Sequence, residues 1–141
     1  EIRLGIPAYF PQDYIPDANQ RLLFYKRLAS LGDLKELDGL KEEIQDRYGP
    51  YAPEVENLFL VMYLRRVLKD YLVQQITYND GRLSLLFHPD SPVKVKRLVD
   101  LIGKDQARYR FSPEGRLSFS PQSRDWNGLI PEVIGFLQAI E

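Results

Sequence analysis

The sequence contains no cysteine and only one histidine, one tryptophan and one methionine among its 141 residues. Without cysteine, the chain can form no disulfide, no thiolate nucleophile and no cysteine-ligated metal site. Its one histidine, His88, has no second histidine or cysteine with which to build a zinc or iron site, and we expect it on the surface or partly packed. These absences are typical of a cytoplasmic protein, and we expect no cofactor in this chain.

Long apolar runs and nucleotide-binding motifs are also missing. No run approaches the ~18 apolar residues that cross a bilayer, and no signal peptide is visible, so no membrane partner is expected. Phosphate loops, dinucleotide fingerprints and nucleophile elbows are absent, and the many carboxylates lie on amphipathic helices, where they usually form a solvated face. We therefore expect a domain that is not an enzyme. It begins with Glu1, as a piece of a longer protein would.

The composition is that of a folded domain with a balanced charge. Hydrophobic residues make up 44% of the chain and aromatic residues 12%, which is enough to bury a core. The formal net charge of -1 gives no overall reason to expect a nucleic-acid or anionic-membrane binder.

Residues 1–16 carry three of the ten prolines and are expected to form an extended lead-in or interdomain arm. Within it, residues 6–10 have the pattern of a short edge strand, where proline is tolerated. The arm is either held down by its own apolar residues or serves as a linker from a preceding domain, and both can be true. The residues that would hold it are Tyr9, Phe10, Tyr14 and Ile15.

Three helices are predicted in residues 17–72. Asp17 with Gln20, and Asp33 with Glu36, have the spacing of capping boxes, and Pro53 suits the first turn of a helix. The third helix has the widest apolar surface, so we expect it to be the most buried. The predicted helices run from 17 to about 30, from 34 to 48 and from 53 to about 71.

Residues 73–141 change to the period of strands and predict a hairpin, a helix, a second hairpin and a last helix. Residues 79–81 (NDG) are a strong hairpin signal. Ser91-Pro92 is expected to open the first of these helices, with Gly103 closing it, and Pro131 is expected in the first turn of the last helix. The predicted strands are 74–78, 82–87, 107–112 and 116–120.

The predicted fold class is α+β, with three N-terminal helices packed beside a four-stranded antiparallel sheet. The sheet is made of two β-hairpins, each followed by a helix, and residues 17–141 form a single domain. The two hairpins share the text GRLSL at 81–85 and GRLSF at 115–119. This similarity reflects either an internal duplication or the same turn chemistry used twice.

The helix predicted at residues 34–48 has two different sides. Its apolar residues recur at intervals of three and four, which is the period of a half-buried helix. On the side turned away, at about 100° per residue, four residues fall in one band: Glu36, Gly39, Glu43 and Asp46. We call these four the acidic band. The band is either a solvated surface or a contact for a partner rich in arginine.

A second surface suggests a single-stranded nucleic-acid module. Tyr109 and Phe111 lie on a predicted strand, and exposed aromatics with a basic rim would bind unpaired bases. The alternation of the strands can instead bury both rings against the helices, and the slightly acidic net charge also disfavours this alternative. The basic rim would comprise Lys94, Lys96, Arg97 and Lys104.

Several motifs occur together in a specific order and spacing. They are residues 13–17 (DYIPD), 25–30 (YKRLAS), 43–50 (EIQDRYGP) and 53–58 (PEVENL). This series resembles the C-terminal domain of the bacterial transcription-repair coupling factor, also called Mfd. The resemblance covers about residues 7–66 by motif, and the second half resembles the family in its order of elements.

The resemblance implies a parent protein that is an ATP-driven DNA translocase, using ATP and magnesium outside this chain. Such a protein removes stalled RNA polymerase at lesions and recruits nucleotide-excision repair. In the family this terminal domain is not catalytic. It packs on an N-terminal module similar to UvrB, covers the surface that would receive UvrA and restrains the motor. DNA would then be contacted through the motor domains, and the isolated domain would be monomeric.

The resemblance also gives the acidic band a role. Acidic residues at the positions of Glu43 and Asp46 are similar to those that contact arginines of the N-terminal module. Glu36, Gly39 and Arg47 complete the expected interdomain contact, with Glu36 also serving as a cap and Gly39 leaving room for close approach. The packing of Trp126, before the last helix, is left open by the sequence.

Overall fold

The computed structural model describes the backbone of residues 1–141 and every side chain except those of Trp126 and Asn127. The surroundings of Trp126 therefore lie outside the described side chains. The chain divides into two compact units, one of residues 6–66 and one that joins residues 1–5 to residues 67–141. The division falls inside α3 (Pro53–Asp70). Among the described helices, none combines the length and apolarity needed to cross a bilayer.

The helical unit contains α1 (Ala18–Ala29), α2 (Leu34–Tyr48) and the first part of α3. At the start of α2, Asp33 accepts a hydrogen bond from the Glu36 N–H at 2.9 Å, as the sequence predicts. Glu36 accepts one from the Gly32 N–H at 2.6 Å, one residue before the N–H that a capping box uses. Gly49 ends α2 with a positive φ of 84°. The buried core comprises Phe10, Ile15, Phe24, Leu28, Leu37, Leu40, Ile44, Val55, Leu58 and Phe59.

The N-terminal arm is folded into this unit from residue 6 onward. Phe10 and Ile15 are buried, whereas Tyr9 is 47% exposed. The Tyr14 hydroxyl donates to the Gly49 carbonyl at 2.8 Å. The edge strand expected at residues 6–10 is wrong, because the backbone there is irregular and Tyr9 N–H bonds instead to the Glu54 carbonyl at 3.3 Å.

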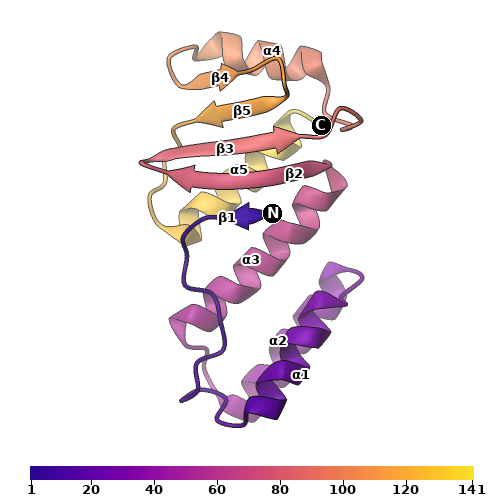
Figure 1. Ribbon diagram of the computed structural model, residues 1–141, viewed down its shortest axis with the longest axis vertical. Helices are drawn as coiled ribbons and strands as arrows, with labels where there is room; N and C mark the ends of the chain where they lie inside the picture. The colour runs from indigo at the N-terminus through magenta and orange to yellow at the C-terminus, as the bar shows by residue number, and fades with distance from the viewer. The chain divides into compact units, whose positions relative to one another are not determined.

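The sheet unit contains β1 (Ile2–Arg3), β2 (Val73–Asn79), β3 (Arg82–Phe87), β4 (Tyr109–Phe111) and β5 (Arg116–Phe119), in the order β1-β2-β3-β5-β4. The α+β class is confirmed, and both hairpins pair as predicted. The count of four antiparallel strands needs correction, because β1 adds a fifth, parallel to β2. Figure 1 shows β1 as a short arrow beside β2.

Both predicted helices of the sheet unit form, as α4 (Val95–Lys104) and α5 (Trp126–Ala139), but their starts differ from prediction. Ser91 does not open α4, because its hydroxyl donates to the Tyr71 carbonyl. The start of α5 is set by Asp125, which accepts from the Gly128 N–H at 2.8 Å. Pro131 consequently lies inside α5 rather than in its first turn.

One face of the sheet forms the core of this unit. Figure 1 shows α5 behind the strands, and Phe136 of α5 lies 5.8 Å from Tyr109 and 5.2 Å from Phe119 between ring centroids. Leu83 and Leu85 of β3 are fully buried on the same face. Alternation along the strands therefore turns the intervening side chains to the opposite face.

Leu72, between α3 and β2, has a positive φ of 52° and is 42% exposed. A leucine in this conformation costs about 1–2 kcal/mol, whereas asparagine adopts it more readily. We expect Leu72→Asn to raise the free energy of unfolding in urea by about 0.5–1 kcal/mol. The control is Leu22→Asn, at a 53%-exposed leucine within α1, which should not stabilise the protein. Equal effects of the two changes would contradict the argument.

Candidate functional site

The acidic band lies on the outward side of α2, opposite buried Leu37 and Ile44. Of its four residues, Glu36, Gly39 and Asp46 are exposed and Glu43 is half-buried. A Cβ added to Gly39 would meet no heavy atom within 4 Å, so the helix surface is open at that point. The band is thus an accessible, largely acidic surface on a helix whose other side is fixed in the core.

Glu43 is already engaged by a residue of the same chain. The Arg27 guanidinium of α1 donates to both carboxylate oxygens, with Arg27 Nη2 at 2.9 Å from Glu43 Oε1. This contact lowers the pKa of Glu43 and raises the pKa of Arg27, chiefly through the hydrogen bonds. The two side chains are 40% and 41% exposed, so solvent screens the pair.

Arg47 lies beside this pair and is held over aromatic rings. Its guanidinium carbon lies 5.6 Å from the centroid of Phe24 and 5.2 Å from that of Tyr48, within the range of a cation–π contact. Arg27 lies over the same Phe24 ring, also at 5.6 Å. The positive charge of Arg47 contributes to the lowered pKa of Glu43. The buried Phe24 ring thus supports both arginines.

The remaining members of the band differ in what they offer a partner. The Glu36 carboxylate is occupied as a cap by the Gly32 N–H. Asp46 is exposed, and no described side chain pairs with its carboxylate. Its charge is one of the lesser causes that raise the pKa of Tyr51, after burial of the Tyr51 side chain and the charge of Glu42. Asp46 is therefore the acidic side chain most available to an incoming cation.

Sequence reasoning missed two features of this surface. No sequence pattern marks Arg27 as part of this surface, because its partner Glu43 lies 16 residues away on another helix. Leu23, an apolar residue of α1, is 46% exposed. Leu23 precedes Arg27 by four residues and so lies on the same side of α1. It adds an apolar element next to the Arg27–Glu43 pair.

The surface expected for single-stranded nucleic acid does not form as predicted. Lys94, Lys96, Arg97 and Lys104 are exposed. Tyr109 is only 8% exposed and stacks on Phe136, whereas Phe111 is 44% exposed. Of the two alternatives for these rings, burial therefore holds for Tyr109, which Phe136 of α5 covers, whereas Phe111 on the same face of β4 is exposed.

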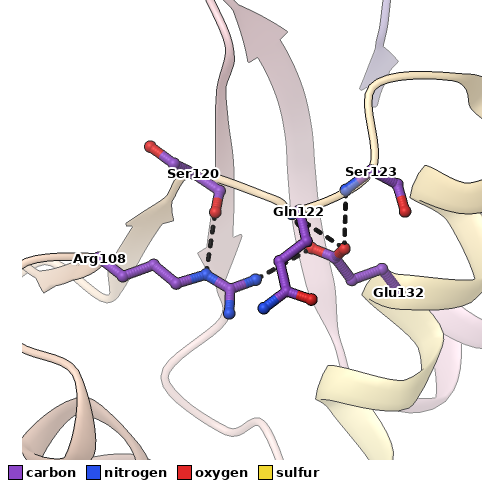
Figure 2. A network of polar contacts seen from close by, with 5 residues as sticks. All are labelled: Arg108, Ser120, Gln122, Ser123 and Glu132. Atoms are coloured by element: carbon purple, nitrogen blue, oxygen red, sulfur yellow. Dashed lines mark hydrogen bonds and ion pairs between the residues drawn. The ribbon is translucent and has the colours of Figure 1, made fainter.

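A polar network in the sheet unit fastens the loop before α5 (Figure 2). The Glu132 carboxylate accepts hydrogen bonds from the Gln122 N–H at 2.9 Å, the Ser123 N–H at 3.1 Å and Arg108 Nη2 at 3.1 Å. Arg108 also donates to the Ser120 carbonyl at 2.9 Å. The Glu132 carboxylate is thus hydrogen-bonded to two backbone N–H groups of the loop and to Arg108, which is a structural role.

Two cavities of the sheet unit hold one carboxylate each, and His88 lines the one that contains Glu114. One cavity of about 220 Å³ contains Glu132 and another of about 210 Å³ contains Glu114, so neither has the two carboxylates of an acid–base pair among the residues that line it. His88 is half-exposed and accepts a hydrogen bond from the Asp90 N–H at 3.0 Å. No group of three metal-ligating side chains occurs among the described residues.

Comparison with known proteins gives one consistent family. The TRCF domain family matches residues 4–98. The transcription-repair-coupling factor of Haemophilus influenzae is 31% identical over 99% of this chain, and that of Escherichia coli is 30% identical over 100%. This chain covers 12% of the length of each of those relatives.

A solved structure shares the fold. The crystal structure of a C-terminal domain of transcription-repair coupling factor aligns with a TM-score of 0.83 and 21% sequence identity. The alignment covers 99% of this chain and 90% of that one. The likeness therefore extends over both units of the chain.

The Arg27–Glu43 pair predicts a pH-dependent effect of Glu43→Gln. Because the pKa of Glu43 is lowered, its contribution to stability is present above the usual value of 4.5 and is lost as the pH falls through the folded-state pKa. We expect the variant to lose about 0.5–1 kcal/mol near neutral pH, a small value because the pair is screened. Urea unfolding at two pH values measures it, with Asp38→Asn as the control. A loss that persists in acid would show that the ion pair is not its cause.

The network around Glu132 predicts a larger loss. Glu132→Ala leaves the Gln122 and Ser123 N–H groups and Arg108 without this acceptor, which costs about 1–3 kcal/mol. Thermal and urea unfolding of the variant would show the loss. The matched control is Glu114→Ala, at a side chain that is 65% exposed, where about 0.5 kcal/mol or less is expected. A similar small loss for both variants would contradict the role given to Glu132.

Proposed function

The chain belongs to the TRCF domain family, and from that premise we propose that it is a non-catalytic regulatory domain of a transcription-repair coupling factor. Relatives that are about eight times longer support this proposal, because this chain covers only 12% of their length. The parent would be an ATP-dependent DNA translocase that couples transcription to nucleotide-excision repair. Its motor domains, its ATP and its magnesium would lie outside these residues.

The proposed partner is the UvrB-like N-terminal module of the same parent. Packing on that module would mask the surface that receives UvrA and would restrain the motor, so the domain is autoinhibitory. Release would follow engagement of RNA polymerase. The surface that makes the contact is the acidic band of α2 together with Arg47.

The observation that carries this proposal is the combination of an unpaired carboxylate and an open helix surface. Asp46 is exposed without a described partner, and nothing lies within 4 Å of a Cβ placed on Gly39. A side chain of the module can approach α2 closely at Gly39, and an arginine of the module can reach Asp46 about two turns further along the same side. Carboxylates bind arginine through strong, often bidentate hydrogen bonds.

The Arg27–Glu43 pair makes such a contact easy to reverse. A module arginine that binds Glu43 must share the carboxylate with Arg27 or replace it. Replacement exchanges one charge-assisted contact for another, so the net gain is small. Exposed ion pairs contribute only about 0–1 kcal/mol each, and each ~1.4 kcal/mol changes an equilibrium tenfold. A few partly desolvated pairs would therefore suffice to hold the domain and still allow its release.

The test is charge reversal in the full-length protein that carries this chain. Glu43→Lys with Asp46→Lys should raise the affinity for UvrA by about tenfold or more, which corresponds to the loss of ~1.4 kcal/mol of restraint. The basal ATPase and translocase activities should rise as well. UvrA binding by surface plasmon resonance and ATP hydrolysis without RNA polymerase are the two measurements.

Asp38→Lys is the matched control, because Asp38 is an exposed carboxylate on α2 outside the acidic band. It should leave UvrA binding and basal activity at the wild-type level. The assignment of Glu43 and Asp46 fails if the double variant changes neither quantity. It also fails if the control releases UvrA binding to the same extent.

A further inference from the structure

A row of polar side chains crosses the sheet from one edge to the other. The register pairs Arg110 of β4 with Ser118 of β5, Ser118 with Ser84 of β3, Ser84 with Thr77 of β2, and Thr77 with Arg3 of β1. Directly opposed residues project to the same face of a sheet. With strands about 4.8 Å apart, the row is about 19 Å long. We call these five residues the polar row.

The polar row lies on the face opposite the core. Each of its members in β3, β4 and β5 alternates with a buried neighbour such as Leu83, Leu117 or Tyr109. The two ends, Arg3 and Arg110, are exposed, and the three hydroxyl residues between them are half-buried. The row therefore presents a guanidinium at each end and short donor side chains in the middle.

Two further arginines flank the row on the same face. Arg116 Nη1 lies 3.4 Å from Ser84 Oγ, and its Nη2 lies 3.4 Å from Gln75 Oε1. Arg82 Nη1 lies 3.5 Å from Ser120 Oγ, while Arg82 Nη2 is buried without a hydrogen-bond partner among the described atoms.

Acidic residues offset this charge only in part. Glu1 pairs with Arg3, and Glu114 Oε1 lies 3.6 Å from Arg116 Nε. These two carboxylate side chains are 47% and 65% exposed, so they can turn into solvent when an anion approaches. The four arginines of this face thus outnumber the two carboxylates that pair with them.

We propose that this sheet face binds the phosphate backbone of a nucleic acid. Arginine, serine and threonine side chains are the usual donors to phosphate oxygens. A protein partner would be expected to bury an apolar centre with aromatic anchors. Leu86 is the one apolar residue among the polar row and the side chains next to it along the strands, and that set contains no aromatic residue. Without an aromatic platform the face cannot stack bases, so recognition is independent of sequence.

This binding is separate from the regulatory contact of α2, because it uses only residues of the sheet unit. It differs from the expectation that the parent touches DNA only through its motor domains. It also differs from the nucleic-acid surface predicted from sequence, which depended on the lysines of α4. Variants of α4 can therefore distinguish the two surfaces.

The experiment measures binding of this 141-residue chain to fluorescein-labelled oligonucleotides by fluorescence anisotropy. One arm uses duplex DNA and the other uses a single strand of the same mixed sequence, both between about 50 and 200 mM salt. Arg110→Glu and Arg116→Glu should each weaken binding by about tenfold. Each should also lower the slope of log affinity against log salt by about one. Lys96→Glu, on α4, should leave binding unchanged.

Comparison of the two oligonucleotides shows whether the face prefers duplex DNA or a single strand, since the preferred form binds more tightly. Arg110 is exposed and pairs with no described side chain, so Arg110→Glu should keep the wild-type melting temperature even if Arg116→Glu does not. The proposal is overturned if the chain binds neither oligonucleotide at the lowest salt. Weakening by Lys96→Glu instead of Arg110→Glu, or tighter binding to polyglutamate than to either oligonucleotide, would also overturn it.

Discussion

The packing of α1 against α2 around Phe24 determines the surface that this chain offers to a partner. The buried ring supports the guanidinium groups of Arg27 and Arg47, and Arg27 in turn binds Glu43. The Glu43 carboxylate of the acidic band is therefore already paired with Arg27, whereas Asp46 on the same side of α2 remains exposed. The surface consequently carries both paired and unpaired charged side chains. Such a surface suits a contact that must form and release, because its net free energy stays within a few kcal/mol.

The two units of the chain present different chemistries. The helical unit carries the acidic band, and the sheet unit carries arginines and hydroxyls on the face opposite α5. A net charge of -1 conceals this separation, because the acidic and basic residues cancel in the total. Formal charge therefore gives a poor guide to what each surface binds, and register and burial give a better one. For the sheet, four pairings in register across the five strands place five polar residues on one face.

Local signals in the sequence were reliable, whereas contacts between distant residues were not predictable. The cap formed by Asp33 and Glu36 and the hairpin at Asp80-Gly81 depend on neighbours in the chain, and both form as expected. β1 has two residues and pairs with a strand more than 70 residues later, so no local pattern marks it. Pro131 misled the prediction of α5, because Asp125 caps that helix one turn earlier. The Arg27–Glu43 pair could not be predicted from the sequence, because it forms only when α1 packs against α2.

The central claim is that the acidic band of α2 binds another module of the same parent protein. The most direct measurement is calorimetric titration of this chain with the isolated N-terminal module of its parent. We expect a measurable affinity that falls by about fivefold for Asp46→Lys, since an exposed charge-assisted contact of about 1 kcal/mol is lost. We also expect an affinity that weakens as salt is added. Binding that is equally tight for wild type and Asp46→Lys at every salt concentration would contradict the claim.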